Sequence, residues 1–150
     1  MWLDAILAYL HFLSIFILFT TLVGEMLLLR TDLDAATVRL LGRVDIAYFA
    51  AAIAVLATGA LRLFLGAKGS AFYLSSWPIY VKLALFAIVG IVSIKPTLRF
   101  IAWRKARERD AAWTVPEAER TSARRALMIE IHVAALIPLA AVIMSRGLAR

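Results

Sequence analysis

Four long apolar segments constrain the fold of this chain more than any other feature. Each is close to the roughly 20 residues that cross the hydrocarbon of a bilayer as a helix. A helix satisfies its own backbone hydrogen bonds in lipid, and the segments lack the period-two alternation of strands. The sequence therefore predicts an all-α polytopic membrane protein, a four-transmembrane-helix bundle that forms a single domain over 1–150. The predicted helices cover about 3–29, 44–65, 77–99 and 122–145.

The composition indicates the same class. Hydrophobic residues make up 63% of the chain and its mean hydropathy is +0.87, whereas soluble domains average about 45–50% apolar residues. Cysteine is absent, which excludes disulfides, thiolate catalysis and iron–sulfur clusters. The net charge of +7 in so apolar a chain points to membrane lipids as partners rather than to nucleic acid.

Lysine and arginine predict the orientation of the helices. Three lie between the first two segments, and nine more lie in and around the polar loop at about 100–121. The opposite side carries only four, which are Arg62, Lys68, Arg146 and Arg150. Because basic loops stay in the cytoplasm, we predict a multi-pass protein of the bacterial inner membrane with both termini in the periplasm. The basic face is expected to contact anionic headgroups, and Trp2, Trp77 and Trp103 are expected at the membrane interfaces.

Ionisable side chains within the apolar segments are the candidate functional residues, because each costs about 2.5–3.5 kcal/mol at bilayer depth on insertion scales. His11 and Glu25 are fourteen residues apart in the sequence, which places them within about 40° on one helix face. At 1.5 Å per residue, His11 lies about 7 Å outside the midplane, and Lys82 and Arg62 lie at similar depths. These three residues are predicted to form an outer basic site, whereas Glu25 and Asp45 lie near the inner interface.

Glu130 and His132 are two residues apart in the last segment and therefore face nearly opposite directions. Glu130 shares its face with small residues that suit packing in the bundle, whereas His132 shares its face with bulky residues that suit lipid or a partner chain. His11 and His132 also differ in height by about 10 Å. A haem held by both histidines is therefore not favoured, and His132 is the weaker candidate for a metal ligand.

Structural roles remain open for the same side chains. His11 is equally consistent with a hydrogen bond to a neighbouring helix and with a ligand or proton carrier. Glu25 and Asp45 are expected to pair with Arg30 and Arg43 near the interface, and Lys82 is expected to reach the outer headgroups with its ammonium group.

Short motifs are spread over most of the chain. They are Tyr9-Leu10-His11-Phe12, Gly24-Glu25 with Arg30, Ala57-Thr58-Gly59 with Arg62, Lys68-Gly69 with Phe72-Tyr73, Lys82-Leu83-Ala84-Leu85-Phe86, and Ser93-Ile94-Lys95-Pro96-Thr97. In these motifs the chain resembles an uncharacterised bacterial family of predicted four-helix membrane proteins, domain of unknown function family 2214. This resemblance implies a membrane bundle but no activity.

More distantly, the chain is similar to HemJ-type protoporphyrinogen oxidases and to copper-resistance D membrane proteins. Both have a Leu-His pair early in the first helix, here Leu10-His11. The HemJ type also has a Trp before a Lys-Leu pair, and a Glu in an arginine-led fourth helix, here Lys82 and Glu130. The chain departs from that type at Ile129, where Asn is usual, and it lacks a histidine in its third helix. The resemblance implies a scaffold that holds haem b through His11, with Lys82 and Glu130 near the site.

Three functions follow as alternatives, and whether the protein is an enzyme stays open. The first is a small haem b-binding, redox-linked protein, in which His11 ligates iron, Lys82 and Arg62 hold propionates or an anionic substrate, and Glu130 and Glu25 handle protons. The second is a non-enzymatic subunit of a homo-oligomer or a larger membrane complex. The third is a copper or small-solute transport module, although the four methionines form no cluster in the sequence and copper(I) prefers soft ligands.

The charge distribution generates a prediction about topology. A reporter domain fused after Arg150 should read as periplasmic, and one inserted near Trp113 should read as cytoplasmic. Protease protection or a compartment-sensitive fluorescent reporter would measure both. The reverse pattern would overturn the assignment of the inner and outer halves.

Overall fold

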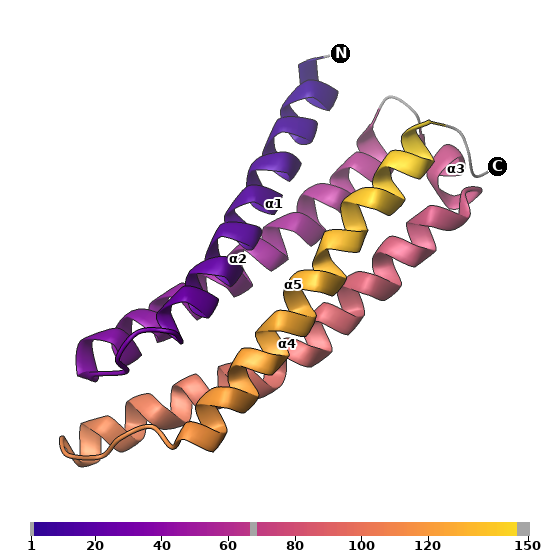
Figure 1. Ribbon diagram of the computed structural model, residues 1–150. Helices are drawn as coiled ribbons and strands as arrows, with labels where there is room; N and C mark the ends of the chain where they lie inside the picture. Colours follow the sequence, from indigo (N-terminus) through magenta and orange to yellow (C-terminus); the bar gives the residue numbers. More distant parts are fainter. Residues whose placement is uncertain (1, 67–68, 147–150) are drawn as a thin grey trace.

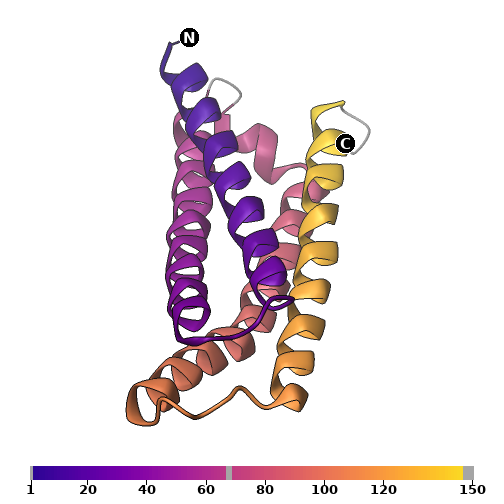
Figure 2. The same cartoon turned by 60° about the vertical axis from the view of Figure 1, so that its left-hand side comes forward.

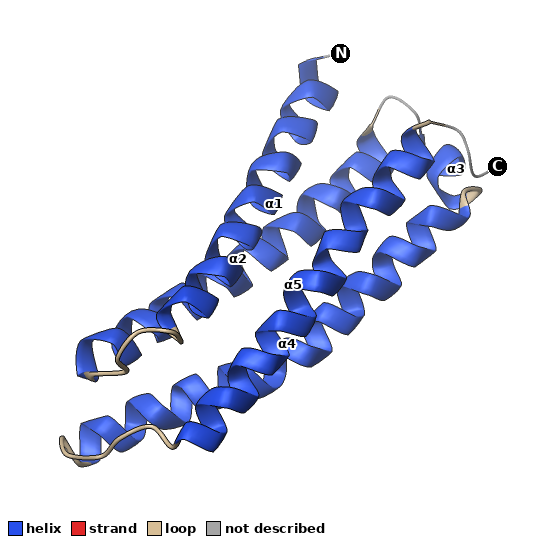
Figure 3. Cartoon of the chain, in the orientation of Figure 1, coloured by secondary structure: helices blue, strands red, loops and turns tan. Residues whose placement is uncertain are grey.

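The computed structural model describes residues 2–66 and 69–146. Within these residues the chain is built from helices and turns, with no strand (Figure 1 and Figure 3). The helices are α1 (Trp2–Leu28), α2 (Ala35–Leu65), α3 (Gly69–Leu74), α4 (Trp77–Arg109) and α5 (Glu117–Ser145). Four of them, all but α3, are long and apolar enough to cross a membrane. The prediction of an all-α bundle with four spanning helices is therefore confirmed.

The four long helices form two hairpins. α1 packs along α2, and α4 packs along α5, whereas contacts of α2 with α4 and of α1 with α5 join the two pairs (Figures 1 and 2). Both hairpin turns lie at one end of the bundle. The first residues of α1 and the last turn of α5 lie at the opposite end, which is the arrangement expected of a four-pass chain (Figure 2).

The start of α2 differs from the sequence prediction. The helix begins at Ala35 rather than near Val44, because the polar segment before the apolar run is itself helical. Asp34 caps this helix, and its side chain accepts a hydrogen bond of 2.7 Å from the backbone N–H of Thr37. That bond stabilises the ionised form and holds the pKa of the exposed Asp34 carboxyl below its usual value.

The polar loop is also shorter than predicted. α4 continues to Arg109, beyond the predicted end of this helix near residue 99. α5 begins at Glu117 rather than at about residue 122, with Glu117 and Glu119 in its first turn. Carboxylates at that position are favoured by the helix dipole. At the opposite end of the bundle, the segment between α2 and α4 contains the short helix α3, which has 6 residues.

The buried core lies mainly toward the end of the bundle that carries the hairpin turns. Its large side chains, all less than 2% exposed, include Leu22, Leu29, Leu41, Phe100, Trp103 and Leu127. Trp103 is buried rather than exposed to lipid, since its indole packs against Phe100 and its Nε1–H donates to Glu119 Oε2 at 2.6 Å. Trp2 and Trp77, in contrast, are exposed, and their position at the membrane interfaces stays a prediction.

Arginine side chains join the two hairpins at this end, which we call the inner end because the charge distribution predicts that it faces the cytoplasm. The guanidinium of Arg120 donates to the backbone carbonyls of Leu29 at 2.8 Å and Thr31 at 3.1 Å, directly after α1. Arg107 on α4 donates to the carbonyl of Leu33 at 2.9 Å. Carbonyls that follow a helix lack partners within it and carry partial negative charge, so cations stabilise them. The basic residues of this end therefore hold α1 and α2 against α4 and α5.

Candidate functional site

Three carboxyl groups lie inside the inner half of the bundle. Glu25 on α1, Asp45 on α2 and Glu130 on α5 are 2%, 5% and 1% exposed. Glu25 is close enough to interact electrostatically with both of the others, and Asp45 with Glu130. We call these three residues the carboxyl cluster. Helical periodicity had placed Glu130 on a packed face, and the structure confirms that placement.

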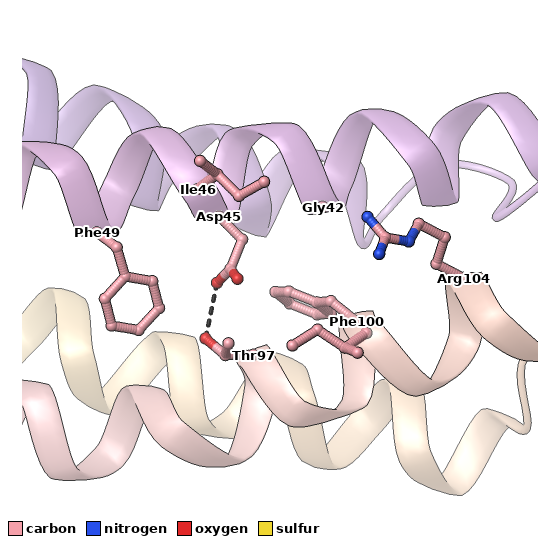
Figure 4. Close-up of a pocket in the computed structure, with 8 residues that line it drawn as sticks. Gly42, Asp45, Ile46, Phe49, Thr97, Phe100 and Arg104 are labelled. Carbon is pink, nitrogen blue, oxygen red and sulfur yellow. Dashed lines mark hydrogen bonds between the residues drawn. The ribbon is translucent and has the colours of Figure 1, made fainter.

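Hydrogen bonding of the carboxyl cluster is incomplete. Asp45 Oδ1 accepts a bond of 2.8 Å from the hydroxyl of Thr97 on α4 (Figure 4). Among the described residues, no donor is in hydrogen-bonding geometry with Glu25 Oε1 or with either carboxyl oxygen of Glu130. Leaving a buried polar group unsatisfied costs roughly 1–3 kcal/mol, and more for a charged group. The cluster therefore carries an energetic cost that packing alone does not explain.

Hydroxyl groups surround the same space. Tyr48 on α2 is buried, and its phenol lies beside both Ser93 on α4 and the carboxyl of Glu130. Sequence reasoning missed Tyr48 and Thr97 as members of the site. The signal is present in the spacing, since Tyr48 follows Asp45 by three residues and Thr97 follows Ser93 by four, and such pairs share a helix face.

The expected ion pairs at the inner interface are not formed. Glu25 and Asp45 are buried, whereas Arg30 and Arg43 are exposed. In the described ranges 2–66 and 69–146, the ion pairs are Arg104 with Glu108 and Arg120 with Glu117, which are neighbours on α4 and α5. The prediction fails because α2 starts well before Asp45, so Asp45 lies inside the helix with its side chain toward α4 rather than near a loop.

The second group of polar residues lies in the outer half. His11 Nδ1 is 2.9 Å from Thr58 Oγ1 on α2. The Thr58 hydroxyl donates a hydrogen bond of 2.6 Å to the backbone carbonyl of Ala54. Because that hydroxyl has only one proton, the imidazole donates from Nδ1 in the tautomer in which the hydroxyl donates to Ala54. The other nitrogen, Nε2, then carries the lone pair of the neutral ring. The imidazole packs on Gly59, where an added Cβ would lie 3.3 Å from His11 Cε1.

Arg62 and Lys82 accompany His11, as the depth argument predicted. Both are close enough to influence the imidazole electrostatically, and they influence each other. The guanidinium carbon of Arg62 lies 5.9 Å from the centre of the Phe12 ring. Its buried Nε has no hydrogen-bond partner among the described residues. The structure thus brings His11, Arg62 and Lys82 together in an outer basic site.

His132 lies apart from both groups. It is exposed on α5, and its Nδ1 is 2.7 Å from the backbone carbonyl of Met128 one turn earlier. The predicted outward face is therefore confirmed. The part of the chain that the structure describes contains no group of three or more His, Asp or Glu side chains placed to hold a metal ion.

The two polar groups occupy different depths. Glu25 follows His11 by fourteen residues on the continuous helix α1, which corresponds to about 21 Å along its axis. The outer basic site and the inner carboxyl cluster are therefore separate sites, although their first members share one helix.

Substitutions at Glu130 test the packed environment of the carboxyl cluster. Glu130→Leu should be tolerated better than Glu130→Arg, because an apolar side chain can pack there whereas a buried unpaired cation cannot. Expression level and thermal unfolding in detergent would measure the difference. Equal tolerance of both substitutions would place Glu130 in an aqueous or headgroup environment instead.

Comparison with known proteins identifies the family. The family model described as predicted membrane protein (DUF2214) matches residues 3–149, which is nearly the whole chain. No curated protein and no solved structure gives a significant match. The chain belongs to the DUF2214 family of predicted membrane proteins.

Proposed function

We propose that this membrane protein takes up and releases protons at the carboxyl cluster formed by Glu25, Asp45 and Glu130. The observation that carries the proposal is the convergence of three nearly inaccessible carboxyl groups from three helices. Among the described residues, three of their oxygens have no donor in hydrogen-bonding geometry, although the Tyr48 phenol lies beside Glu130. Ionisable groups within membrane segments are rare and commonly mark proton or ion pathways.

The electrostatics of the cluster favour a bound proton. Three carboxylates sharing one buried space repel each other, and each also loses its hydration. The chain provides no compensating ion pair to any of them among the described residues. A metal ion would require several oxygens at coordinating distance, and the described acidic residues do not supply that arrangement. A proton needs only one carboxyl oxygen and a neighbouring acceptor.

Neighbouring hydroxyls can pass such a proton onward. A hydroxyl both donates and accepts hydrogen bonds, so it can relay a proton without becoming charged for long. Thr97 already donates to Asp45, and Tyr48 lies between Ser93 and Glu130. These groups connect the α2 side of the cluster with the α5 side. The charge asymmetry of the loops supports placing this half of the bundle on the cytoplasmic side of the bacterial inner membrane, with the chain termini in the periplasm.

Infrared spectroscopy of the reconstituted protein tests the proposal. The wild-type protein should show a carboxylic-acid carbonyl band that shifts on exchange into deuterated water. Glu130→Gln and Glu25→Gln should each remove part of that band, whereas Asp32→Asn, in the exposed turn after α1, should leave it unchanged. A spectrum with no exchangeable carboxylic-acid band would contradict proton binding at the cluster.

A second candidate function is haem b binding at the outer basic site. The specific observation is the hydrogen bond from His11 Nδ1 to Thr58, because it leaves Nε2 as the ligating nitrogen of a neutral imidazole. The donor chemistry fits haem, since His11 would ligate the iron and Arg62 and Lys82 would bind the propionates. Haem would supply one-electron redox chemistry there. His132 does not contribute, so this site offers one histidine per chain.

Histidine substitutions test haem binding directly. If the purified protein shows a Soret band, His11→Ala should abolish or strongly weaken it, whereas His132→Ala should retain most of it. Absorption spectra of the protein expressed with added haem precursor would measure both variants. Equal loss in the two variants would restore a site shared by both histidines, and a wild-type protein with no Soret band would discard the haem proposal.

A further inference from the structure

A cavity lies between α2 and α4 beside the carboxyl cluster. Its volume is about 300 Å³. Most of its wall is apolar, but the carboxyl group of Asp45 projects into it from α2 and meets the Thr97 hydroxyl of α4 (Figure 4). The residues around the cavity are Gly42, Asp45, Ile46, Phe49, Thr97, Phe100, Ile101 and Arg104.

The two ends of the cavity differ in chemistry. Phe49 lines one end of the cavity, and Arg104 lines the other end (Figure 4). The Arg104 side chain is 44% exposed at its end of the cavity. Ile46 and Phe49 on α2 are 64% and 37% exposed, so the cavity is also open along its side. Gly42 leaves open space on the α2 side, because a Cβ added there would meet no atom within 4 Å. Asp45 and Thr97 therefore lie partway along a mostly apolar cavity that has Arg104 at one end.

We propose that this α2–α4 cavity is the route by which water and protons from the cytoplasmic side reach the carboxyl cluster, with Asp45 as the first carboxyl group encountered. The inference rests on the proposed proton function, and it adds where the proton comes from. It also gives separate roles to the three carboxyls, since Asp45 faces the cavity whereas Glu130 has no accessible carboxyl oxygen.

The volume of the cavity is sufficient for water. A water molecule occupies about 30 Å³ of liquid and needs two to four polar partners, so this volume holds a short chain of water molecules. Asp45, Thr97 and Arg104 supply polar partners along its length. A proton moves along hydrogen-bonded water without the transfer of a whole ion, so a short chain of water molecules is sufficient for it.

Cysteine accessibility tests the route, because the natural chain contains no cysteine and gives no background labelling. The variants Phe49→Cys and Ala50→Cys are matched in depth, since adjacent residues differ by about 1.5 Å along a helix. Phe49 lines the cavity and is 37% exposed, whereas Ala50 is exposed but does not line the cavity. A membrane-impermeant, anionic methanethiosulfonate reagent applied to the cytoplasmic side of inside-out vesicles should label Phe49→Cys on the order of tenfold faster, because the reactive thiolate forms in water and not in lipid.

A blocking variant makes the test specific to the cavity. Gly42→Trp, added to Phe49→Cys, should slow labelling severalfold by filling the open space at Gly42, whereas Gly42→Ala should change the rate little. If Phe49→Cys does not accumulate, Ile101→Cys on the cavity wall and its neighbour Ala102→Cys provide the same comparison on α4. Equal labelling of the lining and non-lining cysteines, or no slowing by Gly42→Trp, would overturn the route.

The two proposals fail in distinguishable ways. Cavity-specific labelling together with a missing carboxylic-acid band would support the water route and overturn the proton function. The carboxylic-acid band together with equal labelling of Phe49→Cys and Ala50→Cys would support proton binding and overturn the route.

Discussion

The desolvation of three carboxyl groups within the membrane is the constraint on which the rest of this structure depends. Glu25, Asp45 and Glu130 lie on three different helices, so they share one space only because the α1–α2 hairpin meets the α4–α5 hairpin in the inner half of the bundle. A lipid-facing position for any of them would leave a polar group against hydrocarbon, which is more costly than burial beside hydroxyls. The packing of the two hairpins and the presence of the cluster are therefore linked.

The basic inner end of the molecule supports that packing. Arg120 and Arg107 donate to carbonyls of the α1–α2 turn, and Trp103 and Arg99 of α4 donate to Glu119 of α5. These bonds hold together the end of the bundle at which most of the core residues lie. The same excess of positive charge predicts the cytoplasmic orientation of this end. The arginines of this end thus have a structural role in addition to the topological role that the charge distribution predicts.

Much of this organisation could be predicted from hydropathy and helical periodicity. The four spans, the inward face of Glu130, the outward face of His132 and the proximity of His11, Arg62 and Lys82 all follow from spacing along helices. The errors arise where polar sequence is helical. Hydropathy does not detect that Asp34 caps α2 and starts this helix early. It also does not detect that Trp103 is buried with its indole N–H bonded to Glu119. Pairwise contacts such as Asp45 with Thr97 depend on how two helices rotate against each other, which spacing within one helix does not specify.

A double-mutant cycle on Glu25 and Glu130 tests most directly whether the carboxyl groups form one interacting cluster. The free energy of unfolding would be measured in mixed micelles for Glu25→Gln, Glu130→Gln and the double variant. If the two groups share one buried space, removing either already relieves their repulsion, and the effects should be non-additive by on the order of 0.5–3 kcal/mol. Glu25→Gln combined with Asp32→Asn in the exposed turn should be additive. Additivity of the Glu25 and Glu130 substitutions would contradict the cluster.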